Sequence, residues 1–428
     1  MKYILVLLLG FLTTIASASA QGTFALVGGD IETVANGRIT GGTVVIVDGL
    51  ITAVGRDITP PEGAEVINCS GLTIYPGFFD AGTTLGLIEI GAVEETRDES
   101  EMGEITPHAR ALTAVNPNSV SIPVTRVSGV TTALTAPRGG VLPGTASVIT
   151  LFGYTPDRMA LKGGDALMVN FPEKGSGGWW DERTDEQREK EWKERLTKLE
   201  EVWQGAEVFA RIDSAAEAGG EARRDLTYEH TAPYEAMLPA LRGEIPVVIE
   251  VNRAEDIDSA LAWIRRHNIP RPVLSGVREG WRVADRIAEA GIPCIVGPVL
   301  AIPTRASDRY DRAYANPGLL AAAGVKVALR TNDAENVRNL PFNAGFAVAH
   351  GMEPTEALRA ITLTPAEIFG VDDQVGSIEV GRQGTLFAVE GDPFETNTSP
   401  RYLFIGGWNV PLESRHTQLY NEFLHRTP

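Results

Sequence analysis

The chain is poor in the residues from which proteins build metal centres and disulfides. Of its 428 residues only two are cysteines and six are histidines. Two cysteines cannot form a disulfide framework or a four-thiolate zinc site; at most they form one bridge. We predict instead that Cys69 and Cys294 are small, buried apolar side chains. No histidine lies in an H-x-H pair or at another spacing that is typical of zinc ligands.

Basic residues are scarce relative to acidic ones. The chain has 38 Lys and Arg against 56 Asp and Glu, which gives a formal net charge of −18. This balance argues against nucleic-acid binding, which needs clustered basic residues for the phosphates, and against electrostatic docking on anionic membranes. The hydrophobic content of 43% and charged content of 22% are those of a folded globular protein. The length suits one large domain with an addition, or two to three ordinary domains.

Long apolar runs are absent except at the N-terminus. Lys2 precedes an apolar run from Tyr3 to Ile15, and Ala18-Ser19-Ala20 forms a small-x-small cleavage site. The run is short for a membrane span, and no cysteine follows the cleavage site to carry a lipid. We therefore expect residues 1–20 to be a signal peptide, and the chain to be exported (periplasmic or secreted), to begin at Gln21 and to lack a membrane span.

The two ends of the chain have the pattern of short strands. Residues 23–76 contain two-residue hairpin signals at Asn36-Gly37 and Asp48-Gly49. The same pattern returns at residues 376–389 and 402–405. Each segment is too small to be stable alone, so we predict one composite β-sandwich built from residues 21–72 and from residues 371–428, which include the C-terminal tail.

Between these ends, residues 73–370 alternate apolar runs with helical patterns. Such alternation favours a parallel sheet with crossover helices, and we predict an α/β fold, a (β/α)₈ TIM-like barrel. Strands are predicted at Thr73–Phe79, Val130–Leu134, Ser147–Phe152, Pro246–Val251, Pro272–Leu274, Pro293–Val296 and Val325–Leu329. Helices are predicted at Asp181–Gln204, Asp256–His267, Gly280–Ala290 and Thr355–Ile361.

Three motifs resemble those of the amidohydrolase superfamily. They are Tyr75-Pro76-Gly77-Phe78-Phe79-Asp80-Ala81-Gly82-Thr83-Thr84, residues 363–371 (LTPAEIFGV) and residues 376–386 (GSIEVGRQGTL). The chain is similar to the exported imidazolonepropionase-like branch. The resemblance implies hydrolysis of carbon–nitrogen bonds other than peptide bonds, with one or two divalent metals at the carboxyl ends of the barrel strands.

The ligands that this family uses are largely missing. The first strand of the family ends in Asp-x-His-x-His, and here only Asp80 remains, with Gly82 and Thr84 at the histidine positions. The histidine of the fifth strand falls on Glu250, and that of the sixth strand is absent from residues 271–276. The aspartate of the last strand falls on Asp333, or on Asn332 if the register shifts by one residue.

These substitutions lead to our expectations for the site. Asp80 and Asp333 are the catalytic candidates, and no zinc is expected. Any metal would be weakly bound Mg²⁺ or Mn²⁺, held by Asp80, Glu250 and Asp333. Arg138, which opens a glycine-rich loop after a strand, and His108, which follows an acidic loop, are the candidates for substrate binding.

Two functions of different classes remain open. The first is an amidohydrolase-like enzyme with a lost or altered metal site, acting on a small amide-like substrate. The second is a catalytically inactive relative that serves as a binding or partner subunit. We also expect a homo-oligomer or pairing with a related subunit.

Overall fold

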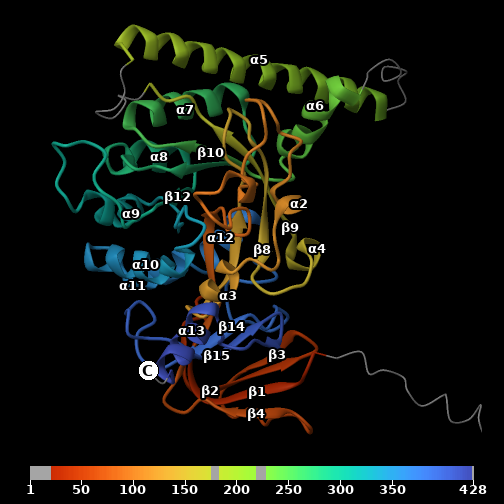
Figure 1. The fold of residues 1–428 in the computed structure, drawn as a ribbon, viewed down its shortest axis with the longest axis vertical. Coiled ribbons are helices and arrows are strands. Elements are labelled where there is room, and N and C mark those ends of the chain that lie inside the picture. The colour runs from red at the N-terminus through yellow and green to blue at the C-terminus, as the bar shows by residue number, and fades with distance from the viewer. Residues whose placement is uncertain (1–20, 175–182, 218–227, 427–428) are drawn as a thin grey trace, which may run out of the picture.

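The protein is described here from a computed structural model, in which residues 21–174, 183–217 and 228–426 are placed. The predicted signal peptide, residues 1–20, lies outside this range. The terminal β-sheet lies at one end of the molecule, the long helix α5 lies at the other, and the barrel strands lie between them (Figure 1). Of the helices in the described residues, none combines the length and the apolar character that a membrane crossing needs.

Strands from both ends of the chain form one eight-stranded sheet in the order β16-β15-β14-β5-β1-β2-β3, with β4 beside β1. The strands β14 (Leu386–Val389) and β5 (Thr73–Pro76) pair antiparallel, which joins the C-terminal strands to the N-terminal ones. The predicted composite domain is therefore confirmed, as a single sheet. Its other strands are β1 (Phe24–Glu32), β2 (Arg38–Val47), β3 (Leu50–Gly55), β4 (Glu65–Asn68), β15 (Pro400–Ile405) and β16 (Trp408–Asn409).

Two local predictions are confirmed. Asp48 and Gly49 have φ angles of 48° and 86°, so they form the left-handed two-residue turn that connects β2 to β3. Cys69 and Cys294 are both unpaired and buried. Burial raises the pKa of each thiol, so both stay protonated and inert near neutral pH.

A second eight-stranded sheet forms the barrel, in the order β13-β12-β11-β10-β9-β8-β7-β6. Its closure joins the ends of the first and last strands, where the Asn332 amide donates to the Gly82 carbonyl at 3.0 Å and the Thr84 amide to the Asp333 carbonyl at 3.1 Å. The strands are β6 (Phe78–Thr83), β7 (Val130–Thr135), β8 (Gly144–Thr150), β9 (Ala160–Asn170), β10 (Val247–Val251), β11 (Pro272–Gly276), β12 (Cys294–Val296) and β13 (Val327–Leu329).

The predicted barrel is thus confirmed, with two departures in detail. The strand β9 has no counterpart among the predicted strands. In addition, β8 runs antiparallel to both β7 and β9, whereas the other neighbouring pairs of this sheet are parallel. A hairpin-like segment therefore replaces one of the crossover units that a regular (β/α)₈ barrel would have.

Helices surround this sheet. Three agree closely with prediction: α7 (Ala254–His267), α8 (Ala284–Ala290) and α11 (Pro354–Ala360). The helix α5 (Asp185–Glu217) continues well beyond its predicted end at Gln204. The remaining α-helices are α2 (Ala111–Ala114), α3 (Ser121–Arg126), α4 (Pro156–Met159), α6 (Tyr228–Leu241), α9 (Arg312–Ala322), α10 (Leu340–Ala349), α12 (Leu363–Phe369) and α13 (Arg415–Leu424).

The interior of the barrel is filled by alternate residues of its strands. Val248 on β10, Val273 on β11 and Ala328 on β13 belong to one buried apolar cluster. Because side chains alternate between the two faces of a strand, the residues two positions further also face inward. These residues are Glu250, Ser275 and Arg330, and they lie at the carboxyl ends of their strands, where barrel enzymes place their sites.

Gly77 separates the two sheets. Thr73–Phe79 was predicted as one strand, but β5 ends at Pro76 in the terminal sheet and β6 begins at Phe78 in the barrel. A Cβ atom at position 77 would lie 2.0 Å from Oγ1 of Thr131 on β7. The backbone therefore passes too close to β7 for any side chain to fit.

We predict that Gly77→Ala destabilises the protein by about 1–3 kcal/mol, because the added methyl group overpacks this junction. The matched control is Gly91→Ala, where no atom lies within 4 Å of the new Cβ and the φ angle is not left-handed. Denaturant unfolding of both variants measures the difference. Equal stability of the two variants would contradict the steric explanation.

Candidate functional site

A cavity of about 310 Å³ opens at the carboxyl ends of the barrel strands. Two of the predicted site residues, Arg138 and Glu250, line this cavity, together with residues that were not predicted to belong to the site. Its lining is Ala81, Gly82, Thr83, Leu134, Ala136, Pro137, Arg138, Met168, Asn170, Val248, Glu250, Ser275, Arg330 and Asn332. We call this cavity the barrel mouth.

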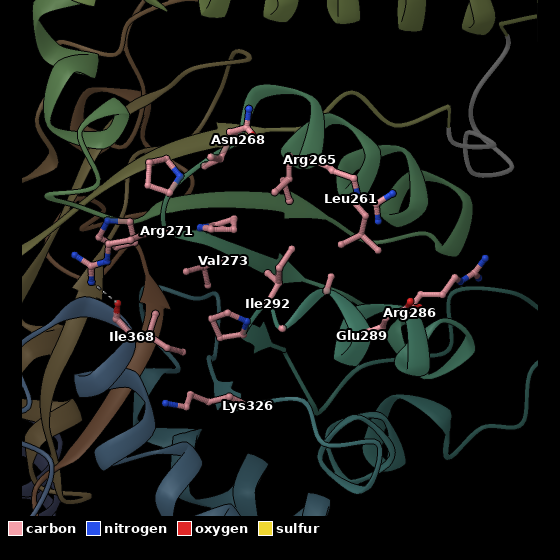
Figure 2. A pocket seen from close by; sticks show the side chains of 18 of the residues that line it. Leu261, Arg265, Asn268, Arg271, Val273, Arg286, Glu289, Ile292, Lys326 and Ile368 are labelled. Carbon is pink, nitrogen blue, oxygen red and sulfur yellow. Dashed lines mark hydrogen bonds between the residues drawn. The ribbon is translucent and has the colours of Figure 1, made fainter.

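A larger cavity, of about 930 Å³, lies at the opposite end of the same strands. Figure 2 shows its lining, which includes Arg271 and Val273 at the start of β11 and Lys326 just before β13. Arg271 donates to the backbone carbonyls of Glu244 and Ile368. None of the predicted site residues lines this cavity, so we take the barrel mouth as the candidate site.

Arg330 is the centre of the barrel mouth. Its Nη1 donates to Oε2 of Glu250 at 2.7 Å and its Nη2 to Oε1 of Glu250 at 2.6 Å. Its Nη1 also donates to Oγ of Ser275 at 2.7 Å, and its Nε to the Gly297 carbonyl at 3.3 Å. The guanidinium therefore ties β13 to β10, β11 and the end of β12. Burial would raise the pKa of Glu250, but the charge and hydrogen bonds of Arg330 hold it below its usual value.

Gly82 makes room for this arginine. A Cβ atom at position 82 would lie 3.0 Å from Cδ of Arg330. The stem of Arg330 therefore occupies the space beside the first strand, at the position where the related family has a histidine. Sequence reasoning missed Arg330. The sequence does contain a signal for it. Arg330 lies two residues after Ala328, so it shares the inward face of β13 with Ala328 and points toward the same interior as Glu250.

Asp80 is a structural tie rather than a residue of the cavity. Its carboxylate accepts hydrogen bonds from the Thr331 amide, the Thr331 hydroxyl and the Gly82 amide. The side chain is fully buried and does not line the barrel mouth. Burial raises the pKa of Asp80 to about 7, even though these hydrogen bonds act in the opposite direction. Asp80 thus links β6 to the end of β13.

Asp333 does not line the barrel mouth either, and Asn332 takes that place. The Asp333 carboxylate accepts from the amides of Glu335 and Asn336, so it caps the turn that follows. Asn332 lies in the lining, with a left-handed φ of 55°. Of the two residues considered for this position, Asn332 is therefore the one that reaches the cavity. The side chain there is a neutral amide.

The two residues predicted to bind substrate lie in different places. Arg138 lines the barrel mouth, and its Nη2 donates to the backbone carbonyl of Asn332 at 2.7 Å and to its Oδ1 at 3.0 Å. His108 is exposed and is not part of this lining. The acidic loop before it folds against the barrel through backbone bonds, such as that from the Thr106 amide to the Leu142 carbonyl, and these leave His108 facing solvent.

The carboxylates at and around the mouth do not fit a divalent metal. Asp80, Glu250 and Asp333 each bond to different partners and do not converge. In the described ranges no three His, Cys, Asp or Glu side chains group so that they could hold one metal ion. The position beside Glu250 is filled by a guanidinium, which carries positive charge and has no lone pair for a metal.

Comparison with known proteins places the chain beside amidohydrolases. The Amidohydrolase family matches residues 278–410. Amidohydrolase tasK of Hapsidospora irregularis is 22% identical over 416 residues, which is 86% of this chain and 39% of that protein. An imidazolonepropionase of Syntrophobacter fumaroxidans is 33% identical over 109 residues, or 24% of each chain. The aligned part of the chain thus spans well under half the length of either relative.

Solved structures share the fold. An amidohydrolase from Thermotoga maritima superposes with a TM-score of 0.78 at 23% identity, covering 91% of this chain and 99% of that one. Molinate hydrolase superposes with a TM-score of 0.57 at 18% identity, covering 92% and 95%. At these identities the likeness is one of architecture, and the chemistry of the site has to be judged from its own residues.

We predict that Glu250→Gln destabilises the protein by about 3 kcal/mol, because it leaves the buried guanidinium of Arg330 without a countercharge. Adding Arg330→Met should recover part of the loss, since both charges are then removed. The matched control is Asp30→Asn, which breaks an exposed pair with Arg38 and should cost about 0–1 kcal/mol. Denaturant unfolding measures these three variants and Arg330→Met alone. Simple additivity of the two mouth substitutions would contradict the coupling.

Proposed function

We propose that this chain, which belongs to the amidohydrolase superfamily, has lost the metal centre of that superfamily and uses its barrel mouth to bind a small molecule. The superfamily's reaction is hydrolysis of carbon–nitrogen bonds other than peptide bonds, with a metal that activates water and polarises the carbonyl. A barrel keeps such a reaction only where it keeps the residues of the site.

The observation that carries the proposal is the place of the Arg330 guanidinium. The stem of Arg330 passes Gly82 on the first strand, and its guanidinium bonds to Glu250 on the fifth strand and to Ser275 on the sixth. Gly82 and Glu250 stand at positions where the superfamily has histidines, and Ser275 lies in the segment where its sixth-strand histidine is missing. A guanidinium is permanently protonated and has no free electron pair, so it can neither coordinate a metal ion nor take a proton from water. A divalent cation at the same place would be repelled by the positive charge of Arg330 and would lack the histidine ligands of the superfamily.

The alternative is that the chain still hydrolyses carbon–nitrogen bonds with Mg²⁺ or Mn²⁺ held by carboxylates. Such a cation takes several oxygen ligands around one point. Of the three candidate ligands, Asp80 is buried against Thr331, Glu250 is paired with Arg330, and Asp333 caps its own loop. These separate partners favour the binding role over the hydrolytic one.

We predict that purified protein holds well below one equivalent of zinc, magnesium or manganese per chain by elemental analysis. Hydrolysis of a panel of cyclic and acyl amides should stay at the background rate, both before and after each metal is added. One tightly held zinc per chain would contradict the proposal. Amidase activity that a chelator abolishes and added zinc restores would contradict it as well.

We also propose that the chain is exported and starts at Gln21, and that it assembles as a homo-oligomer or with a related subunit. The signal-peptide pattern of residues 1–20 supports export. Exposed apolar side chains on α13 support assembly: Tyr420, Phe423 and Leu424 are 66%, 58% and 62% exposed and fall on one helical face. Native mass spectrometry of the exported protein should give the subunit mass of a chain that starts at Gln21, and should show more than one subunit per particle. A monomer that retains Met1 would contradict both parts.

A further inference from the structure

We infer that the molecule bound at the barrel mouth is a small monocarboxylic acid whose carboxylate is held by Arg138 and whose carbonyl or amide oxygen meets Asn332. The inference rests on the proposed function, because it takes the metal-free mouth as a binding site. It deepens that function by naming the chemical groups that the site recognises.

The charges in the lining favour a ligand with one negative charge. The lining contains two arginines, Arg138 and Arg330, and one carboxylate, Glu250. Glu250 bonds to both Nη atoms of Arg330, so the lining carries one more cation than anion. Arg138 makes no direct ion pair with a carboxylate of the described residues, and its Nη2 bonds only to Asn332. Asp333 follows Asn332 in the chain, but its carboxylate is turned to backbone amides of its own loop. One unmatched cation suits a carboxylate better than a phosphate dianion.

The guanidinium of Arg138 has donors to spare. Its Nη2 donates to Asn332, while its Nε and Nη1 have no hydrogen-bond partner among the residues that the structure describes. A guanidinium presents its N–H groups in a planar fork that matches the two oxygens of a carboxylate. The side-chain Nδ2 of Asn332 is likewise without a partner there, so it is available to donate to an oxygen of the same ligand.

The loop that carries Arg138 is held in place on both sides. The Arg138 amide donates to the Glu99 carbonyl at 2.6 Å. Nδ2 of Asn170, at the end of β9, donates to the carbonyls of Gly139 and Gly140 at 3.0 Å each. Oε1 of Glu99 accepts from Arg97, so this carboxylate makes its direct ion pair with Arg97 and not with Arg138. The loop is therefore arranged before any ligand arrives, which reduces the ordering cost of binding.

The other residues of the mouth determine the size and polarity of the rest of the ligand. Leu134, Met168, Val248 and Pro137 give it an apolar wall. A volume of about 310 Å³ admits a compact molecule and excludes a long peptide. A carboxylate, one carbonyl oxygen and a short apolar group fit this combination, and N-acetyl-L-leucine is a simple compound that carries all three.

The test compares acids with their neutral amides by titration calorimetry. The probes are N-acetyl-L-leucine, N-acetyl-L-alanine and hexanoate, each paired with its carboxamide. We expect the wild-type protein to bind at least one acid and to bind it more tightly than the matched amide. Arg138→Gln should weaken acid binding about tenfold or more, because a charge-assisted pair is lost, and should weaken amide binding much less, because a neutral amide loses only an uncharged hydrogen-bond acceptor contact. Arg138→Lys should retain part of the preference, since it keeps the charge without the planar fork.

The control variant is Arg56→Gln, which makes the same change of charge on an exposed residue just after β3, far from the mouth. It should bind the acids as the wild type does. Three results would each overturn the inference: no binding of any acid in the panel, equal binding of acid and amide, or equal weakening by the Arg138 and Arg56 substitutions.

The experiments distinguish a failure of this inference from a failure of the proposed function. Zinc-loaded protein with amidase activity would defeat the proposed function even if Arg138 governed acid binding. Metal-free protein without a preference for acids would defeat the present inference alone.

Discussion

The barrel mouth depends on the ion pair between Arg330 and Glu250. Arg330 is only 7% exposed, so its charge is stable there only because a carboxylate, a hydroxyl and a carbonyl oxygen accept all of its hydrogen bonds. The pair joins four strands across the barrel interior, and it determines what the neighbouring positions can be. Glu250 has to stay ionised, and Gly82 has to stay small.

Closure of the barrel uses a second buried acid beside this pair. The Asp80 carboxylate receives the Thr331 amide and hydroxyl, immediately after Arg330 in the chain. Glu250 on β10 thus holds Arg330, and Asp80 on β6 holds the next residue, Thr331. This arrangement fixes the backbone before Asn332, which then adopts its left-handed conformation and meets Arg138. The position of the exposed cation at the mouth therefore follows from the buried pairs below it.

Most of the fold could be predicted from patterns in the sequence, and the exceptions have physical causes. Apolar β-branched runs located seven of the barrel strands, because strands covered on both faces are continuously apolar. The strand β9 was missed because Lys162, Gly163 and Gly164 interrupt its apolar run. The antiparallel direction of β8 was missed because alternation along a strand carries no information about the direction of its neighbours. The break at Gly77 depends on contact with Thr131, which is distant in the sequence.

The site was predicted less completely than the fold. Arg138 was identified because it lies in a glycine-rich loop after a strand, and Glu250 because the family's fifth-strand histidine falls on it. Asp333 was preferred to Asn332 because aspartate suits catalysis, but the left-handed turn at Asn332 shifts which side chain faces the cavity. Arg330 is not signalled by a pattern of metal ligands, because arginine is not a metal ligand. Its role emerges only when the ends of four strands are placed around it.

The substitutions at the mouth are coupled, and the coupling explains why the family's ligands cannot return one at a time. A histidine at position 82 would compete with the Arg330 stem, since its Cβ would already lie 3.0 Å from Cδ of that arginine. A histidine at position 250 would leave the guanidinium without its countercharge, at a cost of about 3–5 kcal/mol. Removal of Arg330 alone would leave Glu250 without its partner cation. Each single reversal therefore loses stability before any metal chemistry is gained, so the arrangement around Arg330 persists as a unit.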